Sequence, residues 1–203
     1  QTVSFTSGAP VAAKVSGPTY SVAATAAPSG LAVGFTIDAS ATAVCTISGS
    51  TVSFIAVGTC VVNANQPGNA NYNAAPQVQQ SFAVAKGDQT IAFTSTAPVA
   101  AKVAGATYTV TATASPAGLP VTFAIDPAAT SVCSISGATV SFIGAGTCVI
   151  NANQVGNANY NAAPQAQQSF AVAKGDQTIN FTSTTPASAK VAGATYTVAA
   201  TAT

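Results

Sequence analysis

The feature that most constrains this chain is an internal repeat of 88 residues without slippage. The segment VCSISGATVSF at residues 132–142 occurs earlier as VCTISGSTVSF at residues 44–54, and Gln1 is matched by Gln89 and again by Gln177. The 203 residues therefore hold two full copies and the first part of a third. Because a unit of this size closes one small hydrophobic core, the repeat predicts one small domain per full copy.

The repeat also sets the expected domain boundaries. We expect a first repeat at residues 1–86, a second at 87–174 and a partial third at 175–203, with modules that start near residue 28 as an alternative register. Gln1 lies within the repeat pattern and follows neither a starting Met nor a signal segment. This indicates a part excised or processed from a longer protein.

Short linkers separate the copies. They are the tripeptides Lys86-Gly87-Asp88 and Lys174-Gly175-Asp176. Three residues are too few for a long flexible tether, so we expect the modules to stand end to end. The same tripeptide resembles a short integrin-recognition motif, but its position between copies is explained by the linker role.

The pattern of each copy predicts an all-β fold. Short runs of Thr, Val, Ser, Tyr and Phe alternate and are broken by Gly, Pro and Asn. Residues 107–113 predict one half-buried strand with every threonine on the outer face, and residues 133–142 predict a hairpin that turns at Gly137. About seven such strands per copy predict tandem immunoglobulin-like β-sandwich domains.

Each full copy carries one pair of cysteines. The pairs are Cys45 with Cys60 and Cys133 with Cys148, both 15 residues apart and in phase with the core side chains. A zinc site needs CxxC spacing or histidines, and a redox pair needs CxxC and a nearby cation. We therefore predict one disulfide per domain, with buried free thiols as the alternative. A disulfide implies the cell surface, the extracellular space or the periplasm.

The charge composition excludes several classes of function. Only 4% of residues are charged, as five lysines and four aspartates, and His, Arg and Glu are absent. Nucleic-acid binding and anionic membrane surfaces need clustered basic residues, and membrane insertion needs an apolar run of about 20 residues. Without His, Glu or Arg no ordinary nucleophile–base pair can form. We therefore predict no enzyme activity, no catalytic residue, no metal and no cofactor.

Three sets of polar residues leave alternatives open. Asp38 and Asp126 each end a strand and either cap a turn or contribute to a calcium site, which needs six to eight oxygens. Lys14 and Lys102 are either solvated edge lysines or partners of an Asn in an isopeptide bond beside Asp38 or Asp126. Tyr72 and Tyr160 either hydrogen-bond turn backbone or stack on a sugar. In each case the structural alternative is the simpler one.

The motifs QTIxFTS, LPVTFxID, CSISGxTVSF and GTCxINANQxGNANYNAAP resemble the bacterial Ig-like repeats of very large secreted and surface-anchored proteins. The resemblance covers the whole chain and implies a β-sandwich module strung in tandem in a stalk, adhesin or matrix protein. The chain departs from antibody-type domains because it has no Trp, and because its cysteines lie closer in sequence than those of the usual inter-sheet bridge.

Two hypotheses for function follow. The first is a structural repeat of an extracellular surface protein, a rigid spacer or fibre segment whose partners are neighbouring repeats. The second is an adhesive module that binds a glycan or a host ligand, which the sequence does not identify. A filament of identical chains joined by strand donation is a further possibility, because a chain of low charge has little electrostatic repulsion between copies.

Overall fold

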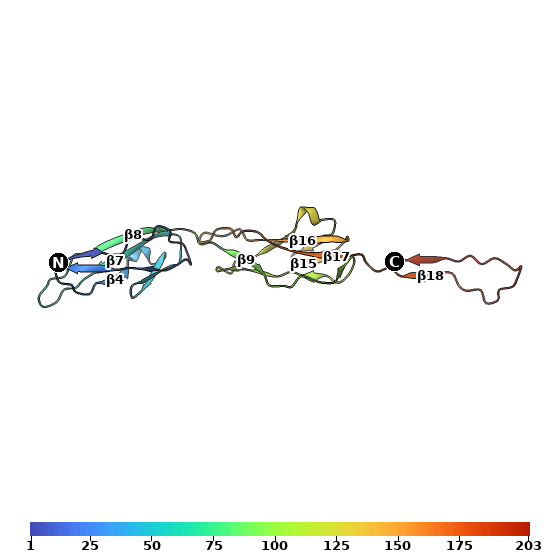
Figure 1. The fold of residues 1–203 in the computed structure, drawn as a ribbon, viewed down its shortest axis with the longest axis horizontal. Helices are drawn as coiled ribbons and strands as arrows, with labels where there is room; N and C mark the ends of the chain where they lie inside the picture. Colours follow the sequence, from blue (N-terminus) through green and yellow to red (C-terminus); the bar gives the residue numbers. More distant parts are fainter. The chain divides into compact units, whose positions relative to one another are not determined.

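The computed structural model describes residues 1–203 and consists of β-strands and two 3-10 helices of three residues each (Figure 1). The prediction of an all-β fold is confirmed. No helix is long and apolar enough to cross a membrane. By its internal contacts the chain divides into two compact units, which are described separately below.

The first unit comprises Gln1–Ser95, Thr111–Phe123 and Asn151–Gln167. It contains the whole first copy, whose strands are β1 (Thr2–Phe5), β2 (Tyr20–Ser21), β3 (Ala24–Ala27), β4 (Gly34–Ile37), β5 (Cys45–Ser48), β6 (Thr51–Phe54), β7 (Gly58–Asn65) and β8 (Val78–Val84). These strands form the sheets β1-β3, β2-β6-β5 and β4-β7-β8. All pairs are antiparallel, and β7 and β8 pair from Gly58↔Val84 to Ala64↔Val78.

The second unit comprises Thr96–Val110, Ala124–Ile150 and Gln168–Thr203. The second copy is divided between the two units, with β9 and β12 in the first. Its strands are β9 (Thr90–Phe93), β10 (Ala101–Lys102), β11 (Tyr108–Thr109), β12 (Ala112–Ser115), β13 (Thr122–Ile125), β14 (Cys133–Ser136), β15 (Thr139–Phe142), β16 (Gly146–Asn153) and β17 (Ala166–Ala173). They form the sheets β12-β9, β11-β15-β14 and β10-β17-β16-β13, with β10 parallel to β17. The sheets of the two copies match. The immunoglobulin-like strand order stays a prediction.

The strand expected at residues 107–113 is broken in two, so the prediction of one continuous strand was wrong. β11 pairs with β15, whereas β12 pairs with β9. Between them Thr111 leaves both ladders: its carbonyl accepts from Thr94 N at 2.8 Å, and its N–H donates to Ser95 Oγ at 2.9 Å. The predicted alternation nevertheless holds across the break, with Val110 buried and the threonines exposed.

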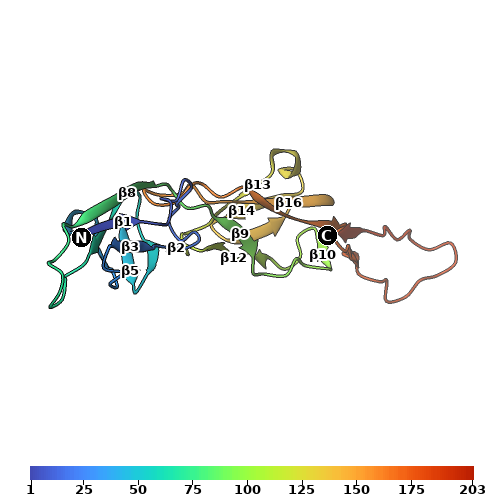
Figure 2. The ribbon, with the colours of Figure 1, turned by 60° about the vertical axis from the view of Figure 1, so that its left-hand side comes forward.

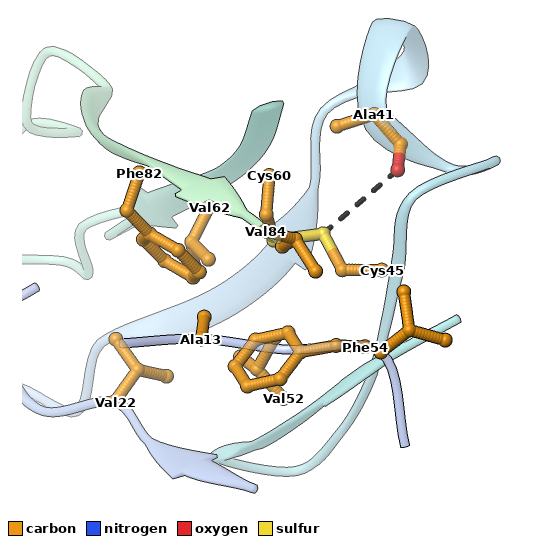
Figure 3. Packing of buried hydrophobic residues seen from close by; sticks show 11 residues of the cluster. Ala13, Val22, Ala41, Cys45, Val52, Phe54, Cys60, Val62, Phe82 and Val84 are labelled. Atoms are coloured by element: carbon orange, nitrogen blue, oxygen red, sulfur yellow. Dashed lines mark hydrogen bonds between the residues drawn. A yellow bond between two sulfur atoms is a disulfide. The ribbon is translucent and has the colours of Figure 1, made fainter. Parts of the chain in front are cut away.

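A core of mostly small side chains lies between the sheets of the first copy (Figure 3). Its buried members are Ala13, Val15, Val22, Ala41, Cys45, Val52, Phe54, Cys60, Val62, Phe82 and Val84. Phe82 packs edge-to-face on Phe54 and on Tyr20, with ring centroids 5.8 and 5.6 Å apart. The second copy repeats this aromatic group with Phe170, Phe142 and Tyr108. The same core is therefore built twice.

A disulfide crosses this core in each copy. Cys45 is bonded to Cys60 and Cys133 to Cys148, the pairs expected from the spacing, and no cysteine is free. Cys45 lies on β5 and Cys60 on β7, which belong to different sheets. The bridge is thus an inter-sheet bridge in spite of the short spacing. The chain returns along β6 until Phe54 lies opposite Cys45 and then crosses to β7, all within 15 residues.

The bonded sulfur also contacts the short helix η1 (Ala39–Ala41). Cys45 Sγ lies 3.8 Å from the Ala41 carbonyl oxygen, as marked in Figure 3. A disulfide sulfur carries no proton, so this is a packing contact and no hydrogen bond. The equivalent contact joins Cys133 to Ala129 in the second copy, again at 3.8 Å.

The partial third copy forms only its first hairpin, β18 (Ile179–Phe181) with β19 (Ala200–Ala202), drawn in red in Figure 2. Ile179 and Phe181 are 72% and 74% exposed. Their counterparts in the first copy, Val3 and Phe5, are packed against the core. The residues that cover this hairpin in a full copy come later in the repeat than Thr203.

Candidate inter-repeat junction

The two strand-ending aspartates are helix caps. Asp38 Oδ1 accepts from Ser40 N at 3.0 Å at the start of η1, and Asp126 Oδ1 accepts from Ala128 N at 3.0 Å at the start of η2 (Pro127–Ala129). The hydroxyl and backbone N–H of Ser40 hold the pKa of Asp38 below its ordinary value. No three side chains among His, Cys, Asp and Glu are grouped closely enough to hold a metal ion.

The lysines considered for a crosslink pair with the tripeptide aspartates. Lys14 Nζ lies 2.6 Å from Asp88 Oδ2, and Asn161 Nδ2 donates to Asp88 Oδ1 at 2.8 Å. The hydrogen bond from Lys14, followed by that from Asn161 and by the lysine charge, lowers the pKa of Asp88. The isopeptide alternative placed Asp38 or Asp126 beside the lysine, but Asp38 accepts from the amides of Asn63 and Gln79.

The same ion pair recurs between Lys102 and Asp176 in the second unit. In both copies the lysine lies on a short segment that pairs in parallel with the last strand of its repeat. Lys14 bridges Ala85, and Lys102 in β10 pairs with Ala173 in β17. In each case the lysine therefore forms an ion pair with the aspartate at the start of the following repeat.

An Asn-rich loop of the second copy, residues 154–163, is hydrogen-bonded to the tripeptide Lys86–Asp88. Gly87 N donates to Asn159 O at 2.9 Å, and Asn161 N donates back to Gly87 O at 2.9 Å. Lys86 Nζ donates to Asn157 O at 2.7 Å. The tripeptide is consequently held against this loop by one parallel β-bridge, between Gly87 and Tyr160.

The same loop contacts the first copy, and all residues involved belong to the first compact unit. The Tyr160 hydroxyl lies 2.6 Å from Ser16 Oγ, and Val57 N donates to Asn159 Oδ1 at 3.1 Å. The ring of Tyr160 packs against the core of the first copy. Tyr160 was expected to bond turn backbone through its hydroxyl. It bonds a serine of the preceding repeat instead.

Residue 87 must be a glycine because its surroundings leave no room for a Cβ atom. A Cβ at residue 87 would lie 2.4 Å from the Val15 carbonyl oxygen and 3.0 Å from the Tyr160 ring. The first distance is impossible without a backbone shift. The tripeptide is therefore packed between the first copy and the Asn-rich loop, and Gly is the residue that fits.

Gln89, which follows the tripeptide, is a buried polar residue that the sequence analysis missed. Its Nε2 donates to Gln154 Oε1 and to Asn161 O, both at 2.7 Å, while its Oε1 is buried without a partner. In the first copy the equivalent Gln1 Oε1 accepts from the Ser29 hydroxyl. The counterpart of Ser29 is Ala117, which explains the missing bond. The signal in the sequence was a Gln directly after each Lys-Gly-Asp.

Comparisons with known proteins give no family. No family profile and no curated protein matches the chain. Among solved structures, surface layer protein SbsC domains 1–6 is 16% identical with a TM-score of 0.33, covering 88% of this chain and 29% of that one. SbsC domains 4–9 is 15% identical with a TM-score of 0.29, covering 92% and 34%. At these values the likeness supports no conclusion about fold or function.

We expect Gly87→Ala to destabilise the protein by about 1–3 kcal/mol, because the new methyl group overpacks the junction. Gly8→Ala is the matched control, since a Cβ there meets nothing within 4 Å. Urea unfolding followed by circular dichroism measures both. Equal stability of the two variants would contradict the tight packing described at Gly87.

Ala117→Ser should stabilise the protein by about 1 kcal/mol, because it supplies a donor to the orphaned Gln89 Oε1. The reverse change in the first copy, Ser29→Ala, should cost a similar amount. Thermal unfolding of both variants tests the pair. If Ala117→Ser is neutral while Ser29→Ala is destabilising, the two copies do not share this hydrogen bond in the way inferred.

Proposed function

We propose that the chain is a structural segment of an extracellular surface protein, in which tandem repeats act as a spacer or stalk. The observation that carries this proposal is the recurrence of the ion pair at the end of each full copy, Lys14–Asp88 and Lys102–Asp176. Each pair joins a repeat to the first residues of the next. A further copy with the same residues is able to add in the same way.

The cysteines support the extracellular location. All four are in disulfides and are at most 1% exposed. Disulfides of this kind persist in oxidising environments. The ionisable side chains support a non-catalytic role, because Lys14, Lys102, Asp38 and Asp126 are used in ion pairs and helix caps and His, Glu and Arg are absent.

A spacer must keep its length under tension, which single-molecule pulling on the 203-residue chain tests. We expect two unfolding events of similar size from the two full copies, each with its disulfide loop still closed. Reduction should lengthen each event by about 50 Å, because 15 more residues become extensible. Smooth extension without discrete events would contradict a tension-resistant spacer.

Adhesion is the competing function, and a binding screen of the same chain against glycans and host surface proteins separates the two. We expect no saturable binding. The Asn-rich loop of the first copy, residues 66–75, is the counterpart of residues 154–163 and carries the exposed Tyr72. Saturable binding that is lost in Tyr72→Ala would replace the spacer by an adhesive module.

A further inference from the structure

The Asn-rich loop of residues 154–163 is part of the second copy in sequence but is packed on the first copy in space. It connects β16 to β17, the strands that carry the buried Cys148 and Phe170 of the second copy. The loop nevertheless lies in the compact unit that contains the whole first copy. One segment therefore links the folding of two copies that the repeat pattern separates.

The loop holds its own shape through internal hydrogen bonds. The side chain of Asn157 accepts from the backbone N–H groups of Asn159 at 2.8 Å and of Tyr160 at 2.9 Å. Asn157 N also donates to Tyr160 O at 3.0 Å. Residues 66–75 repeat these bonds around Asn69, so the shape is a property of the repeat itself. A loop that is already ordered loses little conformational freedom when it packs against another surface.

The base of the loop is fixed within the second copy. Gln154 Oε1 accepts from Gln89 Nε2 at 2.7 Å and from Gly156 N at 2.6 Å. Gln89 and Gln154 are only 2% and 6% exposed. Because these buried bonds exist only while the second copy is folded, the position of the loop depends on the folding of that copy.

The tip of the loop closes one end of the first copy. The half-buried ring of Tyr160 packs against the core of the first copy, and its hydroxyl lies 2.6 Å from Ser16 Oγ. Val57 N donates to Asn159 Oδ1 at 3.1 Å. If the loop left this position, apolar surface of the first copy would meet water and the Val57 N–H would lose its partner.

We propose that this loop couples the folding of the two copies, so that each copy is more stable while the other is folded. Tyr160 carries most of the coupling, because a packed aromatic side chain with a bonded hydroxyl dominates the energy of such a contact. A coupling free energy is shared equally by the two partners, so the first copy stabilises the second by the same amount. The copies then behave as coupled neighbours, not as independent domains. This goes beyond the spacer role and does not depend on it.

Hydrogen exchange of the full 203-residue chain, followed by mass spectrometry, tests the coupling. The reporter is β7, whose amides exchange when the first copy opens; β16 differs from it at Val62, which is Ile150 in the second copy, so their peptides have different masses. We expect Tyr160→Ala to accelerate exchange of the β7 amides about tenfold or more, although Tyr160 belongs to the second copy. Val155→Ala is the matched control, since Val155 lies in the same loop and is 86% exposed, and it should leave this exchange unchanged.

A mutant cycle isolates the hydrogen bond between the copies. Tyr160→Phe and Ser16→Ala should each accelerate exchange of the β7 amides about two- to fivefold. The two changes together should have no more effect than either alone, because both remove the same bond. Fully additive effects would show that the bond does not join the copies.

Unfolding one copy tests the coupling without altering the loop. Val140 is fully buried in the second copy, so Val140→Asp should unfold that copy. We expect the β7 amides to exchange at least as fast in this variant as in Tyr160→Ala. The mirror variant Val52→Asp, in the first copy, should accelerate exchange of the β16 amides in the same way.

Two results would overturn the proposal. Unchanged exchange of the β7 amides in both Tyr160→Ala and Val140→Asp would show that the copies fold independently. Acceleration in Tyr160→Ala but not in Val140→Asp would show that the loop keeps its position without a folded second copy, and the contact would then be local to the first copy.

Discussion

A core of small side chains closed by a buried disulfide is the constraint on which the rest of the structure depends. Val, Ala and Cys supply most of the buried residues of the first copy, with two phenylalanines among them. A core of this size gives marginal stability in a domain of under 90 residues. The bridge from β5 to β7 joins the sheets β2-β6-β5 and β4-β7-β8, and closing such a loop contributes about 3 kcal/mol in the chain-entropy model. This is a large part of the 5–15 kcal/mol of a typical domain.

The contacts at the ends of the repeats require particular residues, as the cores do. Gly87 leaves room for the carbonyl of Val15 and for the ring of Tyr160, and Lys14 binds the aspartate beside it. These contacts use residues that recur at a distance of 88, so the sequence identity between copies has a structural reason outside the core. Exposed ion pairs contribute little energy by themselves. The packing of Gly87 and the backbone bonds to the Asn-rich loop fix the arrangement.

Much of the fold was predictable because its signals are local. Alternation predicted the strands and the buried side of residues 107–113, and the spacing of 15 predicted the cysteine pairs. The break at Thr111 was not predictable, because the alternation runs through it and only the partner strands change. The junction depends on contacts such as Ser16 with Tyr160, 144 residues apart, for which the local pattern holds no signal. The missing hydrogen bond of Gln89 Oε1 can be recognised only when Ser29 and Ala117 are compared within the fold.

That a disulfide closes each full copy in an oxidising compartment is tested most directly by counting free thiols. The protein is taken from its native source under alkylating conditions without reductant, and labelled cysteines are counted by mass spectrometry before and after reduction. We expect no labelled cysteine in this chain before reduction and all four after it. Four labelled cysteines before reduction would contradict both the closed cores and the proposed extracellular location.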